Sequence, residues 1–184
     1  QKLYCYCRHT AARFRSWLRR KYGDLEDLSE AWACTPTRHR YSDWVQVQPP
    51  RSAPVRFGSL GSPGAWLDWR TFINQNFADF VAWQRQIIRE VDEDHPVTTN
   101  LVRTTDVVFG VDPWLYPDTV DALGYDLYPR DRGQGAPYFV SLSLDYARSP
   151  ALHAGKPFWL PEIESGPIGD WVLGPSHPTS GSDI

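Results

Sequence analysis

Apolar side chains recur at helical spacing in four stretches of the chain. In the first, Phe14, Trp17 and Leu18 lie three and four residues apart, which places them on one face of a helix over residues 10–22. The same spacing predicts helices over residues 25–32, 66–91 and 138–153. Six apolar residues share one face of the longest predicted helix: Trp69, Ile73, Phe77, Phe80, Ile87 and Val91.

Short apolar runs that end in polar residues alternate with these helices. Residues 97–100, 121–126 and 158–162 predict three short strands, which end in Asn100, Asp126 and Glu162. Strands separated by helices indicate repeated β/α units and a parallel sheet. Residues 33–65 are rich in Pro and poor in periodicity, and they predict a long irregular loop within the same domain.

The number of strands is too small for a closed barrel. A complete (β/α)₈ barrel has eight strands and about 250 residues, whereas this chain has 184 residues and three predicted strands. We therefore interpret residues 1–184 as a fragment of a single barrel domain, a partial (β/α)₈ TIM barrel of α/β class. The sequence contains no Met, so we interpret Gln1 as an internal position of a longer protein.

The composition excludes several kinds of partner. The formal net charge is −3, so nothing points to nucleic acid or to an anionic membrane surface. No apolar run approaches the roughly 18 residues of a membrane span, and the N-terminus lacks the apolar core of a signal peptide. Nine Trp, nine Tyr and eight Phe fit a protein that stacks sugars on aromatic rings, but a large core would explain them too.

The three cysteines are Cys5, Cys7 and Cys34. An odd number argues against a disulfide framework and for a reducing compartment. Cys5 and Cys7 are weak candidates for two ligands of a zinc ion, because a structural zinc site needs four. His9 and Cys34 are the nearby residues that would have to complete it, and free buried thiols are the default interpretation.

Glu162 follows a buried apolar run and precedes a segment of Ser, Gly and Pro. Barrel enzymes carry their chemistry at this end of their strands. Asn100, Asp126 and Tyr128, at the exits of the two preceding strands, are expected to face the same pocket and to bind substrate. Trp159 and Trp171 bracket the acid and are expected to form part of the pocket wall. The alternative is a turn carboxylate beside a core tryptophan.

Several collinear motifs resemble the β-galactosidases of glycoside hydrolase family 42. They are Cys5-Tyr6-Cys7, Phe14-Arg15-Ser16-Trp17-Leu18, Lys21-Tyr22-Gly23, Leu28-Ser29-Glu30-Ala31-Trp32, Arg40-Tyr41, Val97-Thr98-Thr99-Asn100, Asp126-Leu127-Tyr128-Pro129, Asp145 with Arg148, and Pro157-Phe158-Trp159-Leu160-Pro161-Glu162.

The resemblance implies a retaining glycosidase on a TIM barrel. Its acid/base lies in an Asn-Glu pair after the fourth strand, and its nucleophile is a Glu after the seventh. By position, Glu162 is the nucleophile, and the chain covers roughly the segment from after strand 4 through strand 7. The Asn-Glu pair would precede Gln1, so we expect this chain alone to be inactive.

The resemblance also implies partners. The substrate would be an oligosaccharide with a terminal β-D-galactosyl residue, the full protein a homotrimer, and its location the cytoplasm. Neither nucleic acid nor membrane is expected as a partner.

The chain departs from the family pattern near the cysteines and after the nucleophile. Thr10 stands where the family has a third Cys of a zinc cluster, so we expect no cofactor and no zinc. Glu164 is a competing carboxylate. Two alternative functions stay open: a related α-L-arabinopyranosidase, and a catalytically inactive sugar-binding or interaction module.

Overall fold

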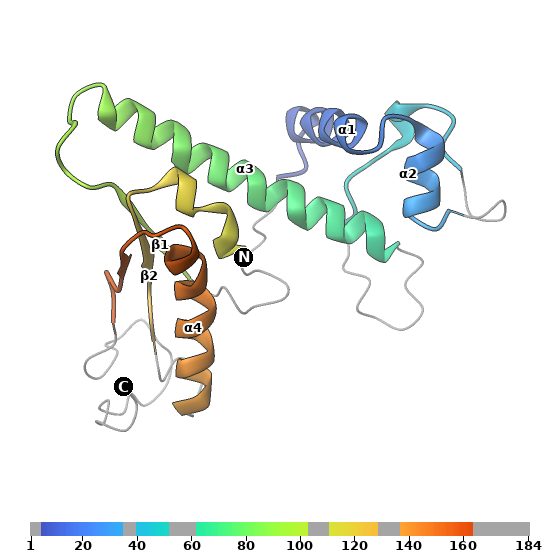
Figure 1. Cartoon of the computed structure of the whole chain (residues 1–184). Helices are drawn as coiled ribbons and strands as arrows, with labels where there is room; N and C mark the ends of the chain where they lie inside the picture. Colours follow the sequence, from blue (N-terminus) through green and yellow to red (C-terminus); the bar gives the residue numbers. More distant parts are fainter. Residues whose placement is uncertain (1–4, 35–39, 52–61, 103–110, 129–136, 164–184) are drawn as a thin grey trace, which may run out of the picture. The chain divides into compact units, whose positions relative to one another are not determined.

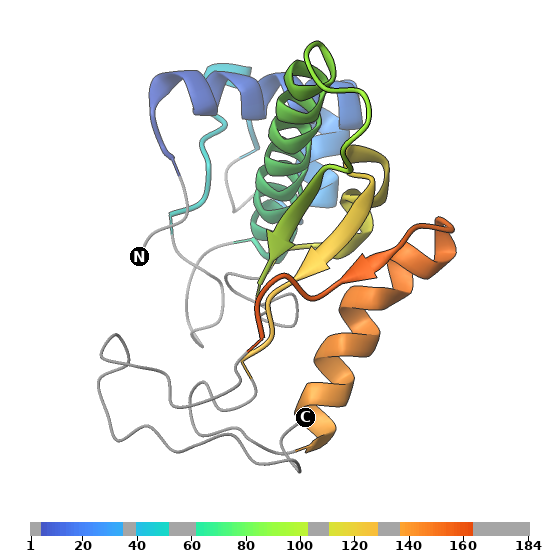
Figure 2. The same ribbon diagram turned by 90° about the vertical axis from the view of Figure 1, so that its left-hand side faces the viewer.

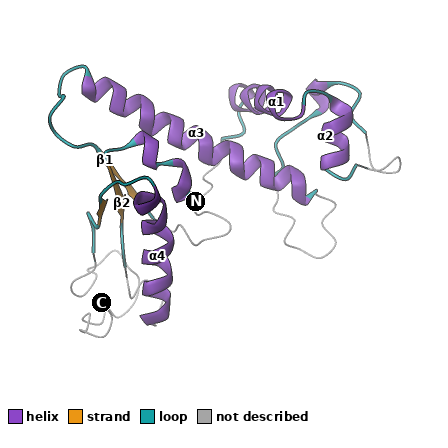
Figure 3. Cartoon of the chain, viewed as in Figure 1, coloured by secondary structure: helices purple, strands orange, loops and turns teal. Residues whose placement is uncertain are grey.

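The computed structural model describes residues 5–34, 40–51, 62–102, 111–128 and 137–163 (Figure 1). The chain divides into two compact units, Gln1–Asn76 and Phe77–Ile184. The boundary falls inside the long helix α3 (Pro63–Arg89). Figure 3 shows that helices make up most of the described structure.

The first unit contains α1 (Arg8–Tyr22), α2 (Leu25–Ala31), the 3₁₀ turn η1 (Trp44–Gln46) and the start of α3. Gly23 ends α1 at φ 80°, a conformation that favours glycine. Asp24 starts α2, because its carboxylate accepts hydrogen bonds from the N–H groups of Glu26 and Asp27. Both predicted helices are thus confirmed to within two residues.

The core of the first unit is aromatic. Phe14, Leu18, Leu28 and Trp69 are fully buried in it. Asp68, from α3, is also buried beside this core. Its carboxylate accepts hydrogen bonds from Lys21 Nζ (2.5 Å), the Tyr22 hydroxyl (2.8 Å) and Trp32 Nε1 (2.8 Å). A buried carboxylate is tolerated when it is paired in this way, so Asp68 joins α1, α2 and α3.

The second unit is built on a parallel sheet of β1 (Thr98–Leu101), β2 (Ala122–Tyr125) and β3 (Phe158–Trp159), in that order. The 3₁₀ turns η2 (Pro113–Leu115) and η3 (Pro117–Thr119) precede β2, and α4 (Pro137–His153) precedes β3. Figure 2 shows the three strands running side by side in one direction. The predicted β/α order and the parallel sheet are confirmed.

Strand β3 is shorter than the predicted 158–162. Pairing with β2 stops after Trp159 and resumes as a single bridge between Leu127 and Ile163. Pro161 lies in this gap, and it has no N–H group to donate to a ladder.

One face of the sheet packs against helices. Leu101, Leu123 and Tyr125 are buried with α4 residues Val140 and Ala147. This fixes which side chains of the strands point toward helices and which point away.

The apolar face predicted for α3 is buried only in its first half, and its last residue lies outside the helix. Trp69 and Ile73 are buried in the first unit, but Phe77, Phe80 and Ile87 are 40%, 51% and 43% exposed, and Val91 lies beyond the helix end. In the second unit Ala78 and Val81 of α3 pack against the sheet core instead. Their small side chains allow a close approach of helix and sheet, which the periodicity of large residues did not reveal.

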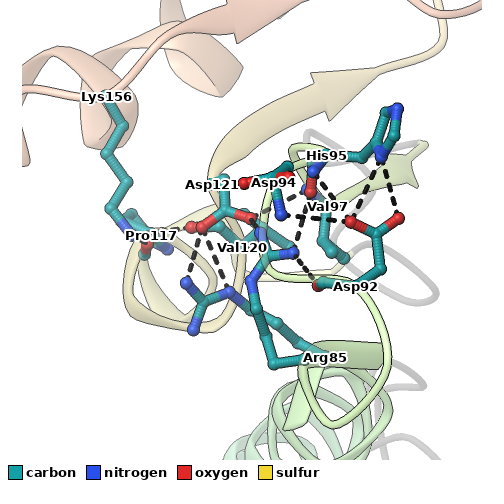
Figure 4. Close-up of polar contacts among 10 residues, drawn as sticks. Arg85, Asp92, Asp94, His95, Val97, Pro117, Val120, Asp121 and Lys156 are labelled. Carbon is teal, nitrogen blue, oxygen red and sulfur yellow. Dashed lines mark hydrogen bonds and ion pairs between the residues drawn. The ribbon is translucent and has the colours of Figure 1, made fainter. Parts of the chain in front are cut away.

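An ion-pair network joins elements at the amino ends of the strands (Figure 4). Asp121 accepts hydrogen bonds from Arg85 and Arg89 of α3, each with a shortest contact of 2.5 Å, and from the Val97 N–H (2.8 Å). The pKa of Asp121 is lowered to about 2, and the hydrogen bond from the Arg85 guanidinium is the largest cause. Lys156, just before β3, donates to the carbonyls of Pro117 and Val120.

The predicted loop over residues 33–65 is only partly described. It contains η1, and α3 begins at Pro63, so its last three positions are helical. No helix among the described residues is both long and apolar enough to cross a membrane.

Candidate active site

The register of the sheet places three site positions in one row. Asn100 pairs with Gly124, and Gly124 pairs with Trp159. Paired residues of neighbouring strands point to the same face, and successive residues alternate between faces. Because Leu123 and Tyr125 point toward the helices, Asn100 and Trp159 point to the opposite face, and Trp159 is 39% exposed there.

Glu162 reaches this face because the chain after β3 contains one extra residue. Three steps along β2, from Gly124 to Leu127, correspond to four steps from Trp159 to Ile163. Leu127 N–H then donates to the Glu162 carbonyl at 2.9 Å. Asp126, which lies two residues after Gly124, therefore shares its face with Glu162 at the carboxyl edge of the sheet.

Both carboxylate oxygens of Glu162 have a donor. Asn100 Nδ2 donates to Oε1 at 3.3 Å, and the Tyr128 hydroxyl donates to Oε2. Glu162 itself is exposed. Two donors aimed at one carboxylate fix its orientation, which is what an attacking carboxylate needs.

Asp126 is the second carboxyl group at this edge, and it is only 9% exposed. The pKa of Asp126 is raised, mainly by burial and to a smaller extent by the negative charge of Glu162. The Asn100 side chain acts in the opposite direction and lowers this pKa. Among the described residues, Asp126 Oδ1 is buried without a hydrogen-bond partner.

Gly124 brings the strands close together below these carboxyl groups. A Cβ atom at this position would lie 2.6 Å from the Thr99 carbonyl oxygen, 2.9 Å from Thr98 Oγ1 and 3.0 Å from Pro161 Cγ. Gly124 was not predicted as a site residue. The available signal is a glycine inside a strand, which often marks a close backbone approach.

Of the predicted site residues, Asn100, Asp126, Tyr128 and Glu162 come together, and Trp159 lies on the same face. Asn100 lies within β1 rather than at its end, because the strand continues to Leu101. Trp171 and the competing Glu164 are outside the described residues.

The cysteines near α1 do not form a complete metal site in the described part of the chain. Cys5 and Cys7 are exposed thiols, and Cys7 Sγ lies 3.5 Å from the Thr10 hydroxyl. The pKa of Cys7 is lowered to about 6, and the hydrogen bond with the Thr10 hydroxyl is the largest cause. No group of three His, Cys, Asp or Glu side chains is arranged around a possible metal ion in the residues that the structure describes. Two thiols and a hydroxyl do not supply four zinc ligands.

Comparisons of the sequence with known proteins identify its family. The sequence profile of glycoside hydrolase family 42, described as β-galactosidase, matches residues 1–182. The β-galactosidase bgaB of Geobacillus kaustophilus is 32% identical over 158 residues, which are 86% of this chain and 22% of that protein.

Solved structures give the same result. A β-galactosidase from the Antarctic haloarchaeon Halorubrum lacusprofundi matches with a TM-score of 0.78 and 26% identity, over 98% of this chain and 27% of that one. A cold-adapted β-galactosidase from Rahnella sp. R3 matches with a TM-score of 0.76 and 27% identity, over 97% of this chain and 25% of that one. The chain thus spans about a quarter of the length of these relatives. With the profile matching almost every residue, the chain belongs to glycoside hydrolase family 42, the β-galactosidase family.

Proposed function

We propose that the protein containing this chain hydrolyses terminal β-D-galactosyl bonds with retention of configuration, and that Glu162 is the nucleophile. The observation that carries the proposal is the arrangement of Glu162, whose two carboxylate oxygens each receive a side-chain hydrogen bond at the carboxyl edge of a parallel sheet. Membership of a family of β-galactosidases supplies the substrate class.

In this scheme Glu162 attacks the anomeric carbon and forms a covalent glycosyl-enzyme, which water then hydrolyses. Asn100 and Tyr128 keep the carboxylate aimed before the attack. A retaining glycosidase needs a second carboxyl group about 5–5.5 Å from the first, to protonate the leaving oxygen and later to activate water. We assign this second carboxyl group to a part of the protein outside residues 1–184. Residues 1–184 themselves would correspond to the barrel segment from after strand 4 through strand 7.

The sugar would bind on the face of the sheet that the helices leave uncovered. Trp159 offers a partly exposed indole on that face, suited to the C–H surface of a pyranose. Trp171 stays a predicted second wall. The alternative sugar is L-arabinopyranose, which lacks the exocyclic hydroxymethyl group of galactose.

The test replaces Glu162 by Gln in the full protein, with an aryl β-D-galactoside as substrate. Glu162→Gln keeps the size and loses the nucleophile, so we expect kcat to fall by several orders of magnitude while sugar binding persists. Glu164→Gln is the matched variant, and we expect it to do much less. Normal turnover in Glu162→Gln with an inactive Glu164→Gln would reverse the assignment.

The same assay on an aryl α-L-arabinopyranoside decides between the two sugars. An unaltered protein without activity on either substrate would support a sugar-binding module instead.

The remaining expectations are proposals that rest on the family resemblance. We propose a homotrimer, a cytoplasmic location and catalysis without a cofactor. The cysteine pair with Thr10 supports the absence of zinc.

A further inference from the structure

Asp126 is a buried carboxyl group beside the proposed nucleophile, and the scheme above gives it no chemical step. It is 9% exposed, it lies on the same face of the sheet as Glu162, and its Oδ1 has no partner among the described residues. Placing a second carboxylate near the first, away from water, is unfavourable for both. A residue held there at such a cost has a role at the site.

Asn100 connects the two carboxyl groups. Its Nδ2 donates to Glu162 Oε1 at 3.3 Å, and Asn100 and Asp126 are diagonal neighbours on the same face of the paired strands, where the Asn100 side chain lowers the pKa of Asp126. An asparagine amide has two N–H donors on one side and one carbonyl acceptor on the other. Two negative acceptors on the same side of Asn100 repel the carbonyl oxygen and attract the NH₂ group.

We propose that Asp126 is a positioning residue for the nucleophile: its carboxylate holds the Asn100 amide with the NH₂ group toward Glu162. This inference rests on the proposed role of Glu162. Without the charge on Asp126, the amide loses one acceptor and can rotate its carbonyl toward Glu162. Glu162 Oε1 would then face an acceptor where it now has a donor.

The arrangement depends on pH through Asp126. Among the described residues, Glu162 is the titratable group whose charge acts on Asp126, and the Tyr128 hydroxyl donates to the Glu162 carboxylate. Burial and the charge of Glu162 raise the pKa of Asp126. As the pH falls through that raised value, Asn100 loses its charged acceptor and the rate should fall with it. The wild-type rate profile should therefore carry an acid limb that belongs to Asp126.

The test measures kcat and KM for an aryl β-D-galactoside across pH in the full protein. Asp126→Asn should lower kcat by about tenfold, the effect of one charge-assisted hydrogen bond, while KM changes little. Its acid limb should move to lower pH. Trapping by a 2-deoxy-2-fluorogalactosyl inactivator should slow by the same factor as kcat. Asp145→Asn, the same change at an exposed carboxylate of α4, should leave all of these unchanged.

A double-mutant cycle tests the route through Asn100. If Asp126 acts by orienting Asn100, then the double variant Asp126→Asn with Asn100→Ala is no slower than Asn100→Ala alone. Additive losses would overturn the proposal. So would a raised KM with unchanged kcat, which is the signature of a substrate ligand.

Asn100→Ala alone gives a second test, should Asp126→Asn fail to fold. It should shift the acid limb in the same direction, and an unshifted limb would overturn the proposal. An inactive Glu162→Gln together with an unaltered Asp126→Asn would remove this inference alone. An active Glu162→Gln would instead remove the proposed function.

Discussion

Replacing Gly124 by Ala should disturb the site through the backbone, without touching any catalytic atom. The new Cβ would lie 2.6 Å from the Thr99 carbonyl oxygen, a backbone atom of the paired strand that cannot rotate away. Non-bonded carbon contacts are normally about 3.5 Å, so the strands must separate by roughly 0.9 Å. Overpacking of this kind typically costs about 1–3 kcal/mol of stability.

The same shift pushes on Pro161, which directly precedes Glu162 and whose Cγ would lie 3.0 Å from the new Cβ. A displacement approaching 1 Å in a reacting group can cost on the order of a hundredfold in rate. We therefore expect Gly124→Ala to lower kcat on an aryl β-galactoside by about tenfold to a hundredfold, beyond any loss of folded protein.

Gly155→Ala is the matched control. Gly155 has φ +65° and no atom within 4 Å of a new Cβ, so alanine there is strained but meets no neighbour. Its cost of about 1–2 kcal/mol should appear in denaturant unfolding and not in kcat of the folded enzyme. Equal losses of kcat in the two variants, or normal stability and kcat in Gly124→Ala, would refute the reasoning.

Three further predictions concern single side chains. Tyr128→Phe removes the hydroxyl that donates to Glu162 Oε2. Hydrogen bonds to charged groups contribute about 1.5–3 kcal/mol, so kcat/KM should fall by about tenfold to a hundredfold. An unchanged kcat/KM would mean that this contact does not act in turnover. Asp121→Asn should destabilise the fold by about 1–2 kcal/mol at pH 7. Arg85 is the largest cause that lowers the pKa of Asp121 to about 2 in the folded protein, whereas an unfolded Asp has a pKa of about 4. The ionised carboxylate therefore stabilises the folded state fully above about pH 4. The difference in unfolding free energy between the original protein and Asp121→Asn should vanish as the pH falls from about 4 through 2. Urea unfolding at several pH values measures it, and a difference that persists at low pH would contradict the prediction. The protein should hold less than one zinc per chain after dialysis against a weak chelator, measured by atomic absorption, because Thr10 offers a hydroxyl beside Cys7; stoichiometric zinc would contradict this.

The regular elements were accessible from the sequence because their signals are local. The three apolar runs predicted the strands, and their polar ends predicted the residues that meet at the carboxyl edge, since parallel strands end at one side of a sheet. The pairing of Asn100 with Glu162 spans 62 residues and depends on strand register, which no local pattern encodes. The spacing of the large apolar residues along α3 does not indicate which side chains lie against the sheet: Ala78 and Val81 do, whereas Phe80 is exposed.

The extra residue between Trp159 and Ile163 makes the site sensitive to chain length as well as to residue identity. Inserting one more residue between Trp159 and Glu162, with the single bulge kept, would move Glu162 from the position opposite Asp126 to the position opposite Leu127, which points toward the helices. Such an insertion would inactivate the enzyme although every functional side chain is still present. An alignment that scores only matching residues would overlook the loss, whereas the spacing between the tryptophan and the acid would reveal it.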